Sequence, residues 1–166
     1  MEIRQWLLAS MALIAGSVAI SISAQADTLP EDYQGNWYGY ISSEKVHQQR
    51  HYYVGQVTLT GDQVAYDYFY TGNKQLKKLQ WKWGASALAT YKAKTDKQNR
   101  QNYRIYTPVY SDEVLARVRL TVTKLNGKKI QALVLHTDDE DLYLFKKPTR
   151  SHAWGFEHED ELYIYY

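Results

Sequence analysis

The chain has 166 residues, no cysteine, 16 tyrosines and a formal net charge of +2. The near-neutral charge argues against a nucleic-acid-binding protein, which needs a dense cationic face. The absence of cysteine excludes a disulfide scaffold and a lipid anchor attached to a cysteine.

The first 26 residues have the pattern of a signal peptide. Arg4 precedes an apolar run that begins at Trp6, and Ala24-Gln25-Ala26 is an A-x-A site of the kind that signal peptidase cuts. We therefore expect a secreted protein; a periplasmic location and retention by an uncleaved signal anchor are the alternatives. Removal of residues 1–26 leaves 166 − 26 = 140 residues. One domain of that size buries a core without cross-links, and we expect no membrane span after cleavage because no second hydrophobic run follows.

Alternation with a period of two dominates residues 27–166 and predicts β-strands. The predicted stripes that each share one strand face are Trp37-Gly39-Ile41, Tyr53-Gly55-Val57-Leu59, Val64-Tyr66-Tyr68-Tyr70, Leu79-Trp81-Trp83 and Val114-Ala116-Val118-Leu120-Val122. Between them, Gly84-Ala85-Ser86 is expected to turn and residues 94–102 to form an exposed loop. Asn126-Gly127 is the favoured dipeptide of a type I′ hairpin turn, and the last strands are expected over residues 130–136 and 142–146.

These segments predict a single all-β domain. They amount to about eight or nine sequential strands joined by short turns, followed by a short C-terminal tail. A long antiparallel meander loses its exposed edges most simply by closing on itself, so we expect a single antiparallel up-and-down barrel. A two-sheet β-sandwich is the alternative.

Gly35-Asn36-Trp37, at the start of the first predicted strand, resembles the G-x-W signature of the lipocalins and the wider calycin group. The resemblance implies a calycin-like β-barrel domain over residues 27–166, in which Trp37 plugs the closed end. It also implies that a basic residue beyond the last strand packs over that ring. Arg150 matches this residue, and the cation–π contact would contribute about 0.5–1 kcal/mol or more. The stretch 29–38 is similar to the start of the mature domain in small exported proteins of lactic-acid-type Gram-positive bacteria.

Catalysis is not expected from this sequence. The chain has no cysteine, no G-x-S-x-G elbow and no Gly-rich phosphate loop. The acidic runs at 138–141 and 157–161 are typical of solvated turns, since a catalytic carboxylate pair needs an apolar environment for one member. We therefore predict a protein that is not an enzyme and uses no cofactor.

A metal site is not expected either. His47 and His51 lie four residues apart, but in a passage from loop to strand rather than on a helix. His152, His158 and the acidic residues around them combine imidazole and carboxylate, which suits zinc or copper. The mixed charges there are more typical of an ordinary solvated surface.

Binding remains as the predicted function. A barrel of about eight strands either fills its interior with side chains or holds one small ligand, and Gly39 and Gly55 would leave room inside. The side chains predicted to line the site for an apolar or aromatic ligand are Tyr66, Tyr68, Tyr70, Trp81 and Trp83. The alternative is an extracellular interaction module that binds cell-wall glycan or a protein partner through exposed Tyr and Trp, because Tyr38 and Tyr40 face the side opposite to Trp37.

Overall fold

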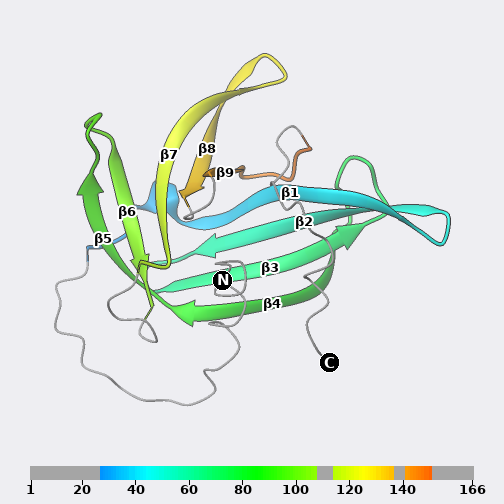
Figure 1. The fold of residues 1–166 in the computed structure, drawn as a ribbon, viewed down its shortest axis with the longest axis horizontal. Helices are drawn as coiled ribbons and strands as arrows, with labels where there is room; N and C mark the ends of the chain where they lie inside the picture. Colours follow the sequence, from blue (N-terminus) through cyan, green and yellow to red (C-terminus); the bar gives the residue numbers. More distant parts are fainter. Residues whose placement is uncertain (1–26, 108–113, 137–140, 151–166) are drawn as a thin grey trace.

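The computed structural model describes residues 27–107, 114–136 and 141–150. These residues form one 3₁₀ turn and nine strands (Figure 1). The elements are η1 (Glu31–Tyr33), β1 (Gly35–Val46), β2 (Gln49–Leu59), β3 (Gln63–Thr71), β4 (Gln80–Leu88), β5 (Thr90–Thr95), β6 (Gln101–Tyr106), β7 (Ala116–Leu125), β8 (Lys128–His136) and β9 (Asp141–Leu144). The described part of the chain is therefore all-β, as the sequence predicts.

The strands make two antiparallel sheets of consecutive strands. One sheet has the order β1-β2-β3-β4, and the other has the order β5-β6-β7-β8-β9. In Figure 1 the first sheet lies across the lower right, while β5 and β6 stand at the left and the β7–β8 hairpin rises above both. The β7–β8 turn has the left-handed φ angles of 49° at Asn126 and 78° at Gly127, as expected for this hairpin dipeptide.

The two sheets meet at two places but do not close into the expected barrel. At one edge, Tyr38 of β1 and Phe145 beyond β9 exchange two backbone hydrogen bonds of 2.7 and 2.8 Å. At the other, Ala89 alone separates β4 from β5, so the chain passes directly from one sheet into the other. The ladder of backbone hydrogen bonds between strands is interrupted at both places, so this arrangement agrees with the two-sheet alternative.

The core lies between the inner faces of the two sheets. It holds Trp37, Val57 and Leu59 from the first sheet and Val118 and Leu133 from the second, all at most 5% exposed. The alternation predicted for β1, β2 and β3 is confirmed, since their stripes supply this core. The β7 stripe leaves the core before it ends, and Val122 is 65% exposed because the hairpin extends past the facing sheet.

The predicted turn at 84–86 is wrong, because β4 continues through it to Leu88. Gly84 serves a different purpose: a Cβ atom there would lie 2.1 Å from Oδ1 of Asp67 and 2.9 Å from the carbonyl oxygen of Tyr66. Glycine is thus needed for close packing against β3 rather than for a change of direction. The predicted loop at 94–102 is also shorter, since β5 runs to Thr95 and β6 begins at Gln101.

A smaller cluster covers part of the outer face of the first sheet. Tyr52, Val54 and Leu76 are buried there, and Leu76 comes from the connection between β3 and β4. Tyr38 and Tyr40, expected to be exposed, pack against this cluster and are half-buried. This packing reduces the exposure of two of the aromatic rings that the sequence offers to an outside partner.

Candidate functional site

One row of residues crosses the inner face of the first sheet in register. Gly39 pairs with Gly55, Gly55 with Tyr68, and Tyr68 with Trp83. The two glycines are buried and leave two neighbouring strand positions without side chains. The row therefore places two buried backbone positions that carry no side chain directly beside two large rings.

The rings of this row belong to a larger stack. Tyr53 stacks on Tyr68 with ring centroids 5.5 Å apart, and Tyr68 stacks on Trp83 at 5.7 Å. Tyr66 meets Trp83 at 5.4 Å with the ring planes tilted by 45°. Such pairs stabilise each other beyond the area they bury. We call Tyr53, Tyr66, Tyr68 and Trp83 the aromatic stack.

Polar side chains border the aromatic stack. The Nζ atom of Lys82 lies 5.7 Å from the ring centroid of Tyr53, within the range of a cation–π contact. The Tyr53 hydroxyl donates to the Glu44 carboxylate. His51 stacks on Tyr70 with ring centroids 5.5 Å apart. An apolar surface with a few directed polar groups is typical of small-molecule sites.

Burial raises the pKa of two core phenols near the stack. It raises the pKa of Tyr66, and the neighbouring Tyr68 and Asp67 raise it further. Burial also raises the pKa of Tyr91, which lies on β5 of the facing sheet and donates from its hydroxyl to the carbonyl oxygen of Gln63 at 2.8 Å. At neutral pH the Tyr66 side chain in the stack is thus an uncharged hydrogen-bonding group, suited to an uncharged ligand.

Four of the five predicted ligand-binding residues lie on this inner face, namely Tyr66, Tyr68, Tyr70 and Trp83. Trp81 does not join them: it is 60% exposed on the outer face, and its Nε1 donates to Asp67 at 2.9 Å. The physical reason is a β-bulge. Tyr68 pairs with Trp83 and the next residue, Phe69, pairs with Trp81, so β4 carries one extra residue at this point. Two tryptophans two positions apart therefore face opposite sides.

Sequence reasoning missed two contributors to the site. Tyr53 belongs to a stripe that the sequence shows clearly, so its alternation with Gly55 was a usable signal. Lys82 is the extra residue of the bulge, and nothing in the pattern of β4 marks it as a neighbour of the stack.

Trp37 is fully buried at the start of β1, but its cation is not the one predicted. Its Nε1 donates to the carbonyl oxygen of Tyr33 at 2.7 Å, and the Nζ atom of Lys146 lies 3.8 Å from its ring centroid. Arg150 lies instead over Tyr52 on the outer face, 5.3 Å from that centroid. The pairing of Trp37 with Arg150 is wrong because the Tyr38–Phe145 bridge places the very next residue, Lys146, above the indole.

Desolvation accompanies this contact. Burial lowers the pKa of Lys146, and the carboxylate of Asp32 opposes that shift. The Nζ atom also donates to the carbonyl oxygen of Gln34 at 2.6 Å. Lys146 thus joins the lead-in segment before β1 to the chain beyond β9, beside Trp37.

The described residues hold no group of three or more His, Asp or Glu side chains that could bind a metal ion. His47 and His51 lie within them, while the histidines and carboxylates of the tail lie outside. Nor does any helix within the described ranges have the length and apolar character to cross a membrane. No protein-family model, curated protein or solved structure matches this chain.

Proposed function

We propose that the protein is an exported, non-enzymatic binding protein whose aromatic stack holds a small apolar or aromatic molecule. The observation that carries the proposal is the row Gly39–Gly55–Tyr68–Trp83, in which two glycines stand beside two rings. A flat apolar molecule over the glycines would contact the backbone of two strands and the edges of the rings. The tyrosine hydroxyls and Lys82 would supply the few polar contacts that orient it.

Two tryptophans of the same strand provide a matched test. Trp83 belongs to the aromatic stack and Trp81 lies on the opposite face. The probe is the uncharged apolar dye N-phenyl-1-naphthylamine, titrated into the folded mature chain. We expect Trp83→Leu to weaken dye binding about tenfold, a loss of about 1.4 kcal/mol, which is comparable with the roughly 0.5–1.5 kcal/mol that one aromatic pair contributes beyond its buried area. We expect Trp81→Leu to leave binding within about twofold.

Equal effects of the two variants would contradict the proposal. Gly55→Val gives a second measure, because a side chain there would occupy the bare position beside Tyr68 and reduce dye binding without removing a ring. Native mass spectrometry of protein purified from its own host would then search for the natural ligand. Dye binding that survives both Trp83→Leu and Gly55→Val would place the ligand elsewhere.

A second candidate function is supported by the exposed indole of Trp81. Its Nε1 is held by Asp67, and Gln56 approaches the same carboxylate at 3.5 Å on the outer face. An exposed indole beside amide and carboxylate groups suits stacking on a sugar ring with hydrogen bonds to its hydroxyls. Sedimentation with purified cell wall tests this candidate: Trp81→Leu should abolish it and Trp83→Leu should not. Sedimentation that Trp81→Leu leaves unchanged would contradict this candidate.

A further inference from the structure

A second row of residues crosses the outer face of the sheet β5–β9. Lys92 pairs with Arg104, Arg104 with Arg117, Arg117 with His136, and His136 with Asp141. Three side chains of permanent positive charge thus stand on neighbouring strands spaced about 4.8 Å apart. Like charges directly opposite each other destabilise a sheet, so the stability of the fold does not explain this row.

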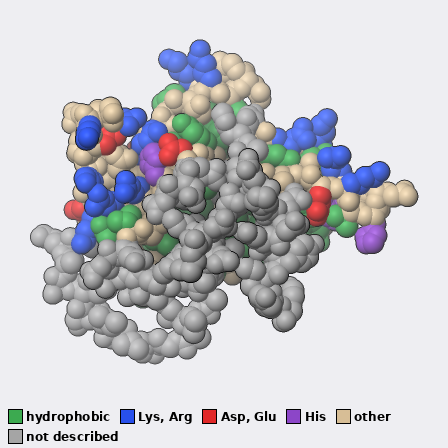
Figure 2. Space-filling model, viewed as in Figure 1, with side chains coloured by type: hydrophobic (Ala, Val, Ile, Leu, Met, Phe, Trp, Pro, Cys, Tyr) green, Lys and Arg blue, Asp and Glu red, His purple; other side chains and the backbone are tan. Residues whose placement is uncertain are grey.

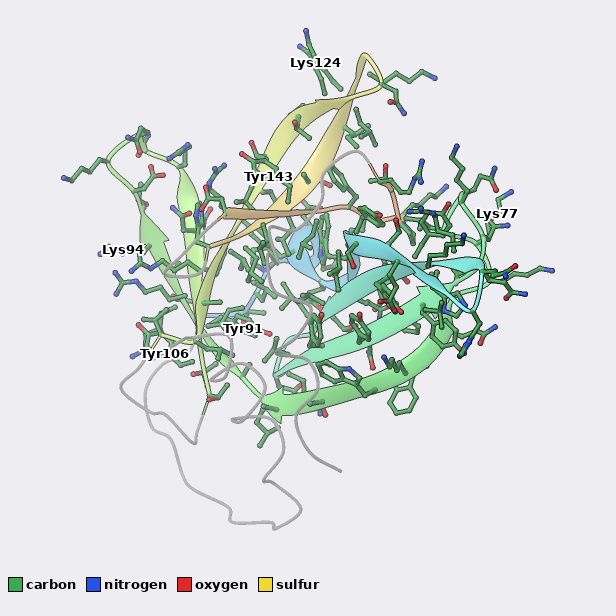
Figure 3. All side chains as sticks on the ribbon, turned by 45° about the vertical axis from the view of Figure 1, so that its right-hand side comes forward. Lys77, Tyr91, Lys94, Tyr106, Lys124 and Tyr143 are labelled. Atoms are coloured by element: carbon green, nitrogen blue, oxygen red, sulfur yellow. The ribbon has the colours of Figure 1, made fainter. Side chains whose placement is uncertain are left out.

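The cations of the row lack acidic partners in the part of the chain that the structure describes. The two ion pairs found there are Arg100–Asp96 and His136–Asp141. Lys92 lies over the ring of Tyr106 at 4.9 Å, and the buried Nε atom of Arg104 has no hydrogen-bond partner. Figure 2 shows Lys and Arg side chains gathered over β5 and β6. Lys94, two residues beyond Lys92 on the same strand, extends the charge outward (Figure 3).

The far end of the row is chemically different. The Nε atom of Arg119 donates to Nε2 of His136 at 3.0 Å, and Nδ1 of the same ring contacts the Asp141 carboxylate. The Arg119 guanidinium and the Asp141 carboxylate thus contact the two ring nitrogens of one imidazole. In sequence, residues 138–140 add three more carboxylates next to this end. Among the described residues of this row, the cations without an acidic partner are therefore Lys92, Arg104 and Arg117.

We propose that these three residues bind a linear phosphate-bearing polymer, a ligand and a surface separate from the aromatic stack. The three positions follow a line of about 10 Å across two strand spacings, which suits successive phosphates of a chain better than one small anion. A bilayer surface is a poorer fit, because membrane-binding faces add exposed apolar groups to the cations. The large hydrophobic side chains exposed in the described residues are Trp81, Leu88 and Val122, and none belongs to this row.

The test compares two triple variants that remove equal charge. The row variant is K92Q/R104Q/R117Q, and the control is K45Q/K74Q/K77Q, three exposed lysines of the other sheet and its β3–β4 connection. The probe is inorganic polyphosphate, titrated calorimetrically at several salt concentrations. The row variant should bind about tenfold or more weakly, and its slope of log K against log salt should fall by about 2, at roughly 0.7–0.9 for each phosphate that is no longer neutralised. The control should stay within about threefold of the wild type.

Three results would overturn the proposal: no polyphosphate binding by the wild type at low salt, equal reductions of affinity in the two triple variants, or binding of phosphatidylglycerol vesicles through the row without binding of polyphosphate. Circular dichroism establishes that each variant is folded. If the triple row variant unfolds, the single variant Arg117→Gln tests the proposal instead, because the Arg117 side chain is exposed. Its affinity for polyphosphate should fall about threefold, and its slope of log K against log salt should fall by about 0.7. R104K/R117K keeps the charges and should retain most of the binding.

Discussion

The contact between Lys146 and Trp37 gives the sharpest prediction for stability. Lys146→Met removes an ammonium 3.8 Å from the indole centroid and its hydrogen bond to Gln34. The ring contact contributes about 0.5–1 kcal/mol, because the ammonium is largely exposed, and the hydrogen bond about 0.5–1.5 kcal/mol, offset by the partial desolvation that lowers the pKa of Lys146. We therefore expect a net decrease in the free energy of unfolding of about 1–2 kcal/mol.

A double-mutant cycle isolates the part due to the ring. Lys146→Met and Arg150→Met are each combined with Trp37→Leu, which alone should cost about 3–5 kcal/mol because the indole is fully buried. Urea unfolding of the four proteins in each cycle gives the coupling free energy. It should be about 1 kcal/mol for Lys146 and within about 0.3 kcal/mol of zero for Arg150, which lies over Tyr52. A larger coupling for Arg150 than for Lys146 would refute this reasoning.

Three further outcomes are expected from single side chains. Gly84→Ala should destabilise the fold by about 1–3 kcal/mol in urea unfolding, since its Cβ would lie 2.1 Å from Oδ1 of Asp67, and Asp67→Ala in the same chain should recover part of the stability. Burial raises the pKa of Tyr66 and Tyr91, so their contribution to stability is full below about pH 10 and disappears at higher pH, where the unfolded chain ionises first. Phenolate absorbance during an alkaline titration should show that both residues ionise only when the protein unfolds. Ionisation of both in the folded protein near pH 10 would contradict this prediction. Backbone hydrogen bonds of the β5–β6 turn lower the pKa of Asp96, so the contribution of its carboxylate to stability is present above about pH 4 and disappears as the pH falls further. Below that pH, amide hydrogen exchange in this turn should accelerate relative to the other turns. Asp96→Asn should abolish this pH-dependent acceleration.

Much of the fold could be predicted because alternation along a strand is a local property. The stripes of β2 and β3 reach the core as the sequence predicts, and Asn126-Gly127 makes the turn expected of it. Closure into a barrel could not be predicted in the same way. It depends on whether distant edges share a continuous ladder, and within the described residues only Tyr38 and Phe145 bridge them.

The candidate site was predicted in part, and its errors have one physical origin. Alternate residues of a sequence lie on the same face of the sheet only while the strand is regular. The bulge at Lys82 interrupts this regularity, so Trp81 lies on the outer face and Trp83 on the inner face. Gly84 was interpreted as a turn for a related reason. The need for glycine there comes from Asp67 on the neighbouring strand, a contact that no local pattern reveals.

The cationic row shows the same limit for charge. A net charge of +2 is a sum over the whole chain, whereas binding depends on how the charges are distributed over the surface. Alternation already places Arg117 on an outward face, but Arg104 and Lys92 become its neighbours only through the pairing of β5, β6 and β7. A near-neutral chain can therefore still present one strongly positive face, provided that its carboxylates lie elsewhere, and a polymer of phosphates would respond to that face rather than to the total.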